Sequence, residues 1–169
     1  ARGIDTKIGL STYVDMMFPP VKAKIKNPDR FWIQFTPISR SYASSITEDT
    51  VIPEPQAYIR NGWTAPRGID QCIALFNARR KDVKLPAYAY EYHFWRHQYL
   101  DPGGMALARR LYEDIYALKL QGIDGYVEDG SQRSGWPNAF PVYIYAETLM
   151  NRDCDFEQVK ADYFSHIYG

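Results

Sequence analysis

The stretch Gly122-Ile123-Asp124-Gly125-Tyr126-Val127-Glu128-Asp129-Gly130 decides the fold class of this chain. It follows a long amphipathic segment, it is too short for a helix, and its core Ile123 to Val127 has the pattern of a buried strand. Glu128 and Asp129 then stand at the carboxyl end of that strand. In α/β proteins ligands bind and chemistry occurs at this edge of the sheet. The alternative is that these acidic residues only cap the next helix.

Composition limits what the chain can be. It has 169 residues, of which 46% are hydrophobic, so it is long and apolar enough for one globular domain with a core. Twenty basic and twenty acidic residues cancel, which gives no electrostatic reason to expect nucleic acid or an anionic membrane as a partner. No apolar run is long enough to span a bilayer. Cys72 and Cys154 lack metal-ligand spacing and do not identify the redox compartment.

Four segments have the pattern of strands, and four others have the pattern of helices. We predict strands at residues 7–14, 31–36, 85–91 and 123–128, and helices at 68–80, 105–120, 138–149 and 155–167. The second strand is nearly all apolar, as expected when both faces of a sheet are covered. Gly122 is placed to end a helix in the left-handed conformation. Asp155 is placed to cap the last helix.

The alternation of strands and helices sets the predicted architecture. It favours an α/β fold with a parallel sheet and right-handed crossovers. Four strands with long loops after them look like half of a TIM (β/α)8 barrel, because a complete barrel needs about 200 residues or more. The chain also begins without an initiator Met, at Ala1. We therefore expect residues 1–169 to form a single domain that is a fragment of a longer protein.

Several segments carry a resemblance to a known family. They are Trp136 to Met150, the turn Asp153-Cys154-Asp155-Phe156, the end Asp162 to Gly169, the stretch Phe31 to Ser41, and Gly122 to Glu128. Together they resemble the C-terminal half of the DUF4838 family of glycoside-hydrolase-like barrels, which is similar to α-glucuronidases and family 20 hexosaminidases. The resemblance implies carbohydrate chemistry, and it implies an extracellular or periplasmic location.

Glycoside hydrolysis usually needs two carboxyl groups, one on each side of the scissile bond. Glu91 and Glu128 each lie near the carboxyl end of a predicted strand, and these strands should be neighbours in the sheet. They are the candidate catalytic pair, with Asp129 as a third candidate. The alternative interpretation is that Glu91 pairs with Arg40 or Arg96 and that Asp129 caps a helix.

The loops supply candidate contacts to a sugar. Aromatic side chains can stack on the apolar faces of pyranose rings, and a guanidinium can bind a uronic carboxylate through two hydrogen bonds. The candidate substrate-binding residues are Arg40, Tyr13, Tyr90, His93, Trp95 and Trp136. A core position is the alternative for Trp136. His93, His97 and Glu91 imitate a metal set, but this spacing serves a metal only on a helix, so we expect no metal and no cofactor.

Two functions remain open from the sequence. The first is a glycoside hydrolase that acts on polysaccharides or oligosaccharides, including those with uronic acids, by carboxylate acid–base catalysis. The second is a carbohydrate-binding or scaffold barrel without catalytic activity. Carboxyl groups about 5 to 10 Å apart in an open cleft favour the hydrolase, whereas carboxyl groups buried in ion pairs favour the binder. A half-barrel leaves open edges and an uncovered face, so the missing N-terminal half or a second copy of the chain is the expected protein partner.

Overall fold

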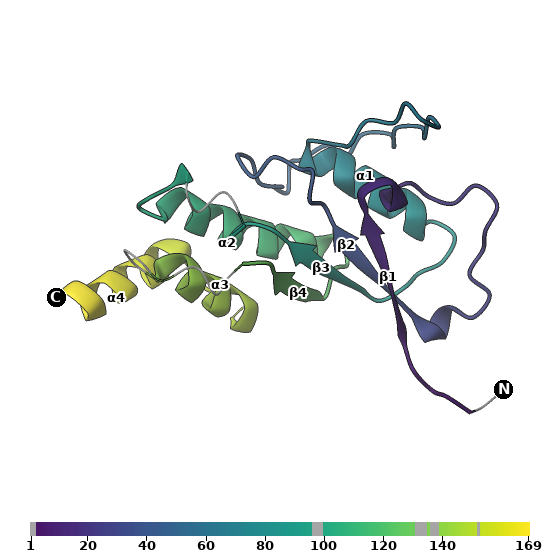
Figure 1. Ribbon diagram of the computed structural model, residues 1–169. Coiled ribbons are helices and arrows are strands. Elements are labelled where there is room, and N and C mark those ends of the chain that lie inside the picture. The colour runs from purple at the N-terminus through teal and green to yellow at the C-terminus, as the bar shows by residue number, and fades with distance from the viewer. Residues whose placement is uncertain (1–2, 96–99, 131–134, 136–138, 152) are drawn as a thin grey trace. The chain divides into compact units, whose positions relative to one another are not determined.

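The computed structural model describes residues 3–95, 100–130, 135, 139–151 and 153–169. Its elements follow one another along the chain as β1 (Ile8–Tyr13), η1 (Val14–Met17), η2 (Pro28–Arg30), β2 (Phe31–Thr36), α1 (Ile69–Arg80), β3 (Ala87–Glu91), α2 (Met105–Leu120), β4 (Gly125–Glu128), α3 (Phe140–Met150) and α4 (Phe156–Tyr168) (Figure 1). No helix in the described part of the chain is both long and apolar enough to cross a membrane.

The four strands form one parallel sheet in the order β1-β2-β3-β4. Ile33 of β2 lies opposite Leu10 of β1 and opposite Ala87 of β3, which fixes the register. The prediction of an α/β fold with four parallel strands in sequential order is therefore confirmed. That the sheet is half of a barrel stays a prediction.

Contacts divide the chain into two compact units. The sheet unit comprises Ala1–Ser41, Asp49–Glu91 and Gly122–Val127, and the helical unit comprises Tyr42–Glu48, Tyr92–Gln121 and Glu128–Gly169. The sheet unit holds β1, β2, β3, α1 and most of β4, whereas α2, α3 and α4 belong to the helical unit. Each unit has a hydrophobic core of its own, described in turn below.

In the sheet unit, α1 covers one face of the sheet. Phe76 of α1 packs on Phe35 of β2 with ring centroids 5.0 Å apart, and Phe35, Ile33 and Ala89 are almost completely buried. Successive residues of a strand point to opposite faces, and Trp32 on the other face is 44% exposed. Thr36, on the same face as Trp32, is only 2% exposed, so this second face of β2 is open at Trp32 and covered at Thr36.

In the helical unit, three helices pack around aromatic side chains. Ala108 of α2, Phe140 and Ile144 of α3 and Phe156 of α4 form one buried cluster, and the guanidinium of Arg109 lies 3.6 Å from the centroid of the Phe156 ring. The predicted apolar face of α2 is confirmed. Its four members, Leu107, Leu111, Ile115 and Leu118, are all buried.

The helix boundaries follow the local signals that the sequence carries. Gly122 has φ +70°, the left-handed conformation predicted for the residue that follows a helix. Asp155 accepts a 2.8 Å hydrogen bond from the backbone N–H of Gln158 through Oδ1, so the predicted cap of α4 is confirmed. Helix α3 begins at Phe140, two residues later than predicted, with Ala139 at its N-cap.

Candidate functional site: a buried carboxylate–histidine network and an open sheet face

A chain of three ionisable side chains lies inside the helical unit. The Nδ1 of His93 is 2.6 Å from Oε1 of Glu128, and its Nε2 is 2.8 Å from Oδ2 of Asp114. The backbone N–H of His93 also donates to Oε2 of Glu128 at 3.2 Å. Both ring nitrogens face carboxylate oxygens, so the doubly protonated imidazolium, with an N–H on each nitrogen, can donate to both carboxylates.

Different parts of the chain position this network. Glu128 is the last residue of β4, His93 lies in the turn after β3, and Asp114 lies in the middle of α2. The segment Tyr42–Glu48 completes the enclosure, because the N–H of Ile46 donates to Oδ1 of Asp114 at 3.1 Å. The ring of Tyr42 packs edge-on against His93 with centroids 4.7 Å apart.

Water is excluded from these three side chains. The side chains of His93 and Asp114 have no exposed surface, and that of Glu128 is 1% exposed. Tyr145 of α3 lies in the same unit, and its pKa is raised to about 12 by burial and, secondarily, by the negative charge of Glu128. Two carboxyl groups that both contact one histidine ring in such an enclosure can hold segments together. They cannot touch a substrate in this arrangement.

Glu91 is enclosed as well, in the sheet unit. Its Oε2 lies 3.5 Å from Nε of Arg40, and neither side chain has exposed surface. The alternative prediction that Glu91 pairs with Arg40 is therefore confirmed. Next to this pair, burial raises the pKa of the Cys72 thiol to about 12, although the positive charge of Arg40 opposes the shift.

Asp129 differs from the other two predicted carboxylates because it is only half-buried. It directly follows β4, at the carboxyl end of a parallel strand. The N-cap residues of the four described helices are Gly68, Gly104, Ala139 and Asp155, so Asp129 caps none of them.

The predicted sugar contacts are distributed over both units. Tyr13, at the end of β1, is 37% exposed, and Tyr90 in β3 is half-buried. Trp95 is half-buried and packs on Tyr92 with centroids 5.9 Å apart, whereas Arg40 and His93 are buried. Trp136 lies outside the described residues, as do Arg96 and His97.

The sheet unit also presents a face that the sequence did not single out. We call it the open face, and it consists of Trp32 and Gln34 of β2, Tyr88 of β3 and Ser11 of β1. The rings of Trp32 and Tyr88 meet edge-on at 6.5 Å, and the Tyr88 hydroxyl donates to Oε1 of Gln34 at 3.0 Å. The Ser11 and Thr36 hydroxyls lie 3.1 Å apart.

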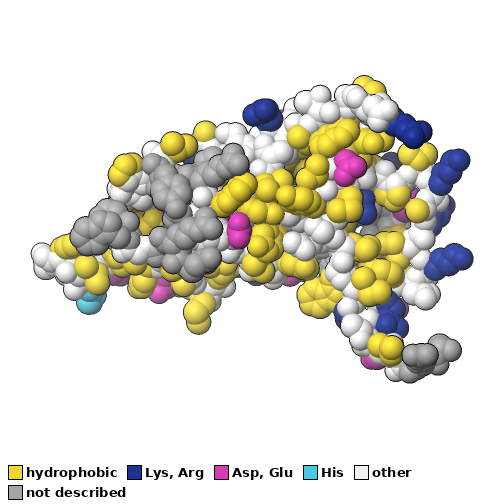
Figure 2. Space-filling model, in the orientation of Figure 1, with side chains coloured by type: hydrophobic (Ala, Val, Ile, Leu, Met, Phe, Trp, Pro, Cys, Tyr) yellow, Lys and Arg dark blue, Asp and Glu magenta, His cyan; other side chains and the backbone are white. Residues whose placement is uncertain are grey.

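In Figure 2, hydrophobic side chains (yellow) and polar or backbone atoms (white) lie side by side in the region of the strands. Gly125 of β4 lies next to the open face, beside Tyr88. A Cβ on Gly125 would lie 3.0 Å from Cβ of Tyr88, so the absence of a side chain lets β4 approach β3 closely there. The open face therefore combines the exposed ring of Trp32 with partly buried aromatic and hydrogen-bonding side chains.

Asp114 and Trp32 are the functional candidates that reasoning from sequence missed. Asp114 falls on the apolar stripe of α2, between Leu111 and Ile115, where a carboxylate needs a buried partner. That position was a usable signal. The apolar neighbours of Trp32 in β2 predict a buried strand residue, whereas its side chain is 44% exposed.

The two units carry opposite charge although the whole chain is neutral. The sheet unit has thirteen Lys and Arg residues against nine Asp and Glu, and the helical unit has seven against eleven. The formal net charges are therefore +4 and −4. Long-range attraction thus favours an anionic ligand for the sheet unit and a cationic ligand for the helical unit.

Comparison of the chain with family models, curated proteins and solved structures gave no match. Within the described residues, no group of three or more His, Cys, Asp or Glu side chains is arranged to hold a metal ion.

Proposed function

We propose that this chain binds carbohydrate through the open face of its sheet unit, as part of a glycoside-hydrolase-like α/β domain. The observation that carries the proposal is the exposed Trp32 ring beside Tyr88, with Gln34 of β2 as a hydrogen-bonding group. Pyranose rings have apolar C–H faces and a rim of hydroxyls. They are complementary to a surface on which aromatic rings and amide or hydroxyl groups alternate.

The burial of Glu91 and Glu128 favours binding over hydrolysis. A catalytic acid must contact the glycosidic oxygen, and the side chains of these residues are at most 1% exposed. Glu91 is held by Arg40 and Glu128 by His93, so both carboxylates act in the proposal as structural anchors.

The charge of the sheet unit favours an acidic glycan. A net charge of +4 attracts uronic carboxylates over the range of a Debye length, about 8 Å at physiological ionic strength. Arg40 is not the group that binds them in this proposal, because its guanidinium is buried against Glu91. The attraction comes instead from the excess of basic residues in the unit as a whole.

The test is binding to a polyuronate and to a neutral glucan, followed by intrinsic tryptophan fluorescence and affinity electrophoresis. We expect the polyuronate to bind more tightly, and Trp32→Ala to weaken binding by about 1–2 kcal/mol, or about five- to thirtyfold. Trp63→Ala is the matched control, since Trp63 is in the same unit and packs on Phe18. If the Trp32→Ala and Trp63→Ala variants bind the polyuronate with equal affinity, the open face is not the binding surface.

Hydrolysis is the second candidate function, and the half-buried carboxylate of Asp129 after β4 favours it. In that case Asp129→Asn abolishes release of reducing sugar from the bound glycan and leaves the melting temperature unchanged. Glu128→Gln lowers the melting temperature instead. A wild-type chain that binds the glycan and releases no reducing sugar is the result expected of a pure binder.

A further inference from the structure

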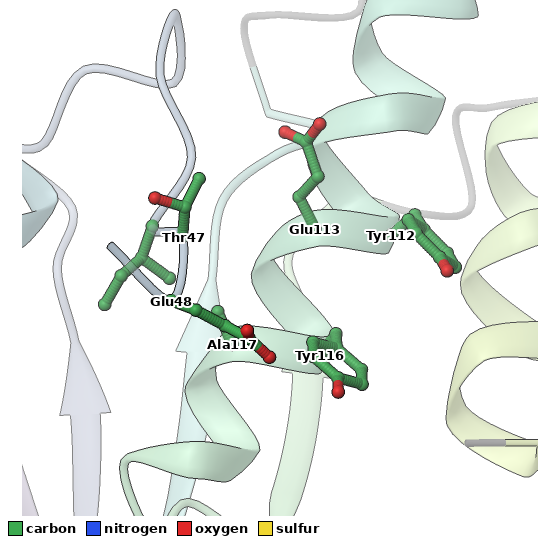
Figure 3. Close-up of a pocket in the computed structure, with 7 residues that line it drawn as sticks. Thr47, Glu48, Tyr112, Glu113, Tyr116 and Ala117 are labelled. Atoms are coloured by element: carbon green, nitrogen blue, oxygen red, sulfur yellow. The ribbon is translucent and has the colours of Figure 1, made fainter. Parts of the chain in front are cut away.

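A pocket of about 260 Å³ opens on the surface of the helical unit. It lies between the segment Tyr42–Glu48 and the side of α2, and its lining residues are Ile46, Thr47, Glu48, Tyr112, Glu113, Tyr116 and Ala117. Figure 3 shows Glu113, Tyr116 and Ala117 along α2, with Thr47 and Glu48 across from them. None of these residues belongs to the open face or to the buried network.

The pocket combines negative charge with apolar and aromatic surface. Glu48 and Glu113 contribute two carboxylates, and Nη1 of Arg110 pairs with Oε2 of Glu113 at 2.9 Å. One guanidinium offsets one of the two carboxylates, so an excess of one negative charge remains. The ring of Tyr116, which is 38% exposed, and the methyl group of Ala117 supply the apolar part.

The pocket walls are fixed by contacts outside the pocket. Ile46 is 1% exposed, and its N–H is bound by Asp114. The hydroxyl of Tyr112 donates to the carbonyl oxygen of Cys154 at 3.0 Å, and its ring meets Phe156 edge-on at 5.5 Å. A ligand therefore meets a largely preformed cavity, which reduces the entropy cost of binding.

We propose that this pocket binds a primary alkylammonium group, with the ammonium near the carboxylate of Glu48 and the alkyl chain over Tyr116 and Ala117 (Figure 3). Carboxylates and the face of a tyrosine ring both attract a cation. Without Glu48, Glu113 and Arg110 the helical unit still has six basic and nine acidic residues, and this net charge of −3 adds a longer-range attraction of the same sign. The volume lies just below the usual range for ligand sites, about 300–1,000 Å³, so it suits one short chain and excludes an oligosaccharide.

A primary alkylammonium group can belong to a free alkylamine or to the side chain of a lysine in a peptide. The probes are n-butylammonium chloride and Nα-acetyl-lysine N-methylamide, added to the full chain and followed by backbone amide chemical shifts. Preferential binding of butylammonium indicates a small-molecule site. Preferential binding of the lysine derivative indicates a site for a peptide side chain, and both results support the proposal.

Matched variants test whether butylammonium binds in this pocket. We expect Glu48→Gln to weaken butylammonium binding by about two- to fivefold, as for a partly exposed ion pair. Glu54→Gln, an exposed carboxylate in the sheet unit, should leave it unchanged. Raising the salt concentration should weaken binding, and neutral n-butanol should bind much less. The proposal is overturned if n-butanol binds as well as butylammonium, or if Glu48→Gln and Glu54→Gln behave alike.

Discussion

Replacement of Asp114 by alanine should destabilise the protein more than removal of any exposed carboxylate. Asp114 accepts from the N–H of Ile46 through Oδ1 at 3.1 Å and contacts Nε2 of His93 through Oδ2 at 2.8 Å. Its side chain has no exposed surface, so water cannot replace either interaction. Alanine would leave a buried N–H without an acceptor and would remove one of the two carboxylates that hold His93.

The expected loss follows from these two contacts. Breaking a buried ion pair by removal of one partner costs about 3–5 kcal/mol, and leaving a buried backbone donor unsatisfied costs about 1–3 kcal/mol. Because the two costs fall on one site they are not additive, and we expect Asp114→Ala to lower the free energy of unfolding by about 3–5 kcal/mol. For a chain of this length each kcal/mol corresponds to about 2–4 °C in melting temperature.

Urea unfolding is the assay, since a lower midpoint at constant m value isolates a change in stability. Glu113→Ala is the control on the same helix, because Glu113 is 30% exposed and pairs with Arg110 at the surface. It should cost less than about 1 kcal/mol. Asp114→Asn keeps the shape and an acceptor for Ile46, so it should fall between the two. A loss of less than about 1 kcal/mol for Asp114→Ala would refute a structural role of the network.

Three further predictions concern the thiols, the last helix and self-association. Because burial raises the pKa of Cys72 from its ordinary value of 9.0 to about 12, iodoacetamide at pH 8 should label this thiol in urea and leave it unlabelled in the native chain. The protonated thiol is favoured by the fold, so its contribution to stability is present below about pH 9 and is lost as the pH rises towards about 12. Asp155→Ala removes the acceptor of the Gln158 N–H and should cost about 0.5–2 kcal/mol in urea unfolding, whereas Asp155→Asn should cost little. The strands β1 and β4 are the edges of the parallel sheet, so light scattering should detect concentration-dependent dimers, and a monomer at all concentrations would contradict this.

The elements of the fold could be predicted because each has a local signal. The period of 3.6 residues in α2 and the left-handed glycine after it are set by neighbours in sequence. The cap of α4 is also local, because Asp155 accepts a hydrogen bond from the N–H of Gln158, only three positions away. Tertiary contacts change such short-range patterns little: the largest differences from the predicted boundaries, at the starts of α3, β3 and β4, are two residues each.

The site could not be predicted in the same way, because its contacts are long-range. Asp114 meets His93, 21 residues away, and Ile46, 68 residues away. No local pattern specifies such partners, although a carboxylate on an apolar helix face shows that a partner must exist. The opposite charges of the two units were hidden for a related reason, since the units are discontinuous in sequence.

A residue can lie at the carboxyl end of a strand and still point to either face of the sheet. Glu91 lies at the carboxyl end of β3. Because successive side chains of a strand alternate between the two faces, Glu91 points to the same buried face as Ala87 and Ala89. Glu128 ends β4 and belongs to the helical unit, where its carboxylate contacts His93. A carboxylate that is buried needs a partner: Arg40 pairs with Glu91, and the ring of His93 contacts Glu128. A ligand of the sheet unit must therefore be recognised by side chains that point to the open face. Among these, Trp32 has the most exposed aromatic surface.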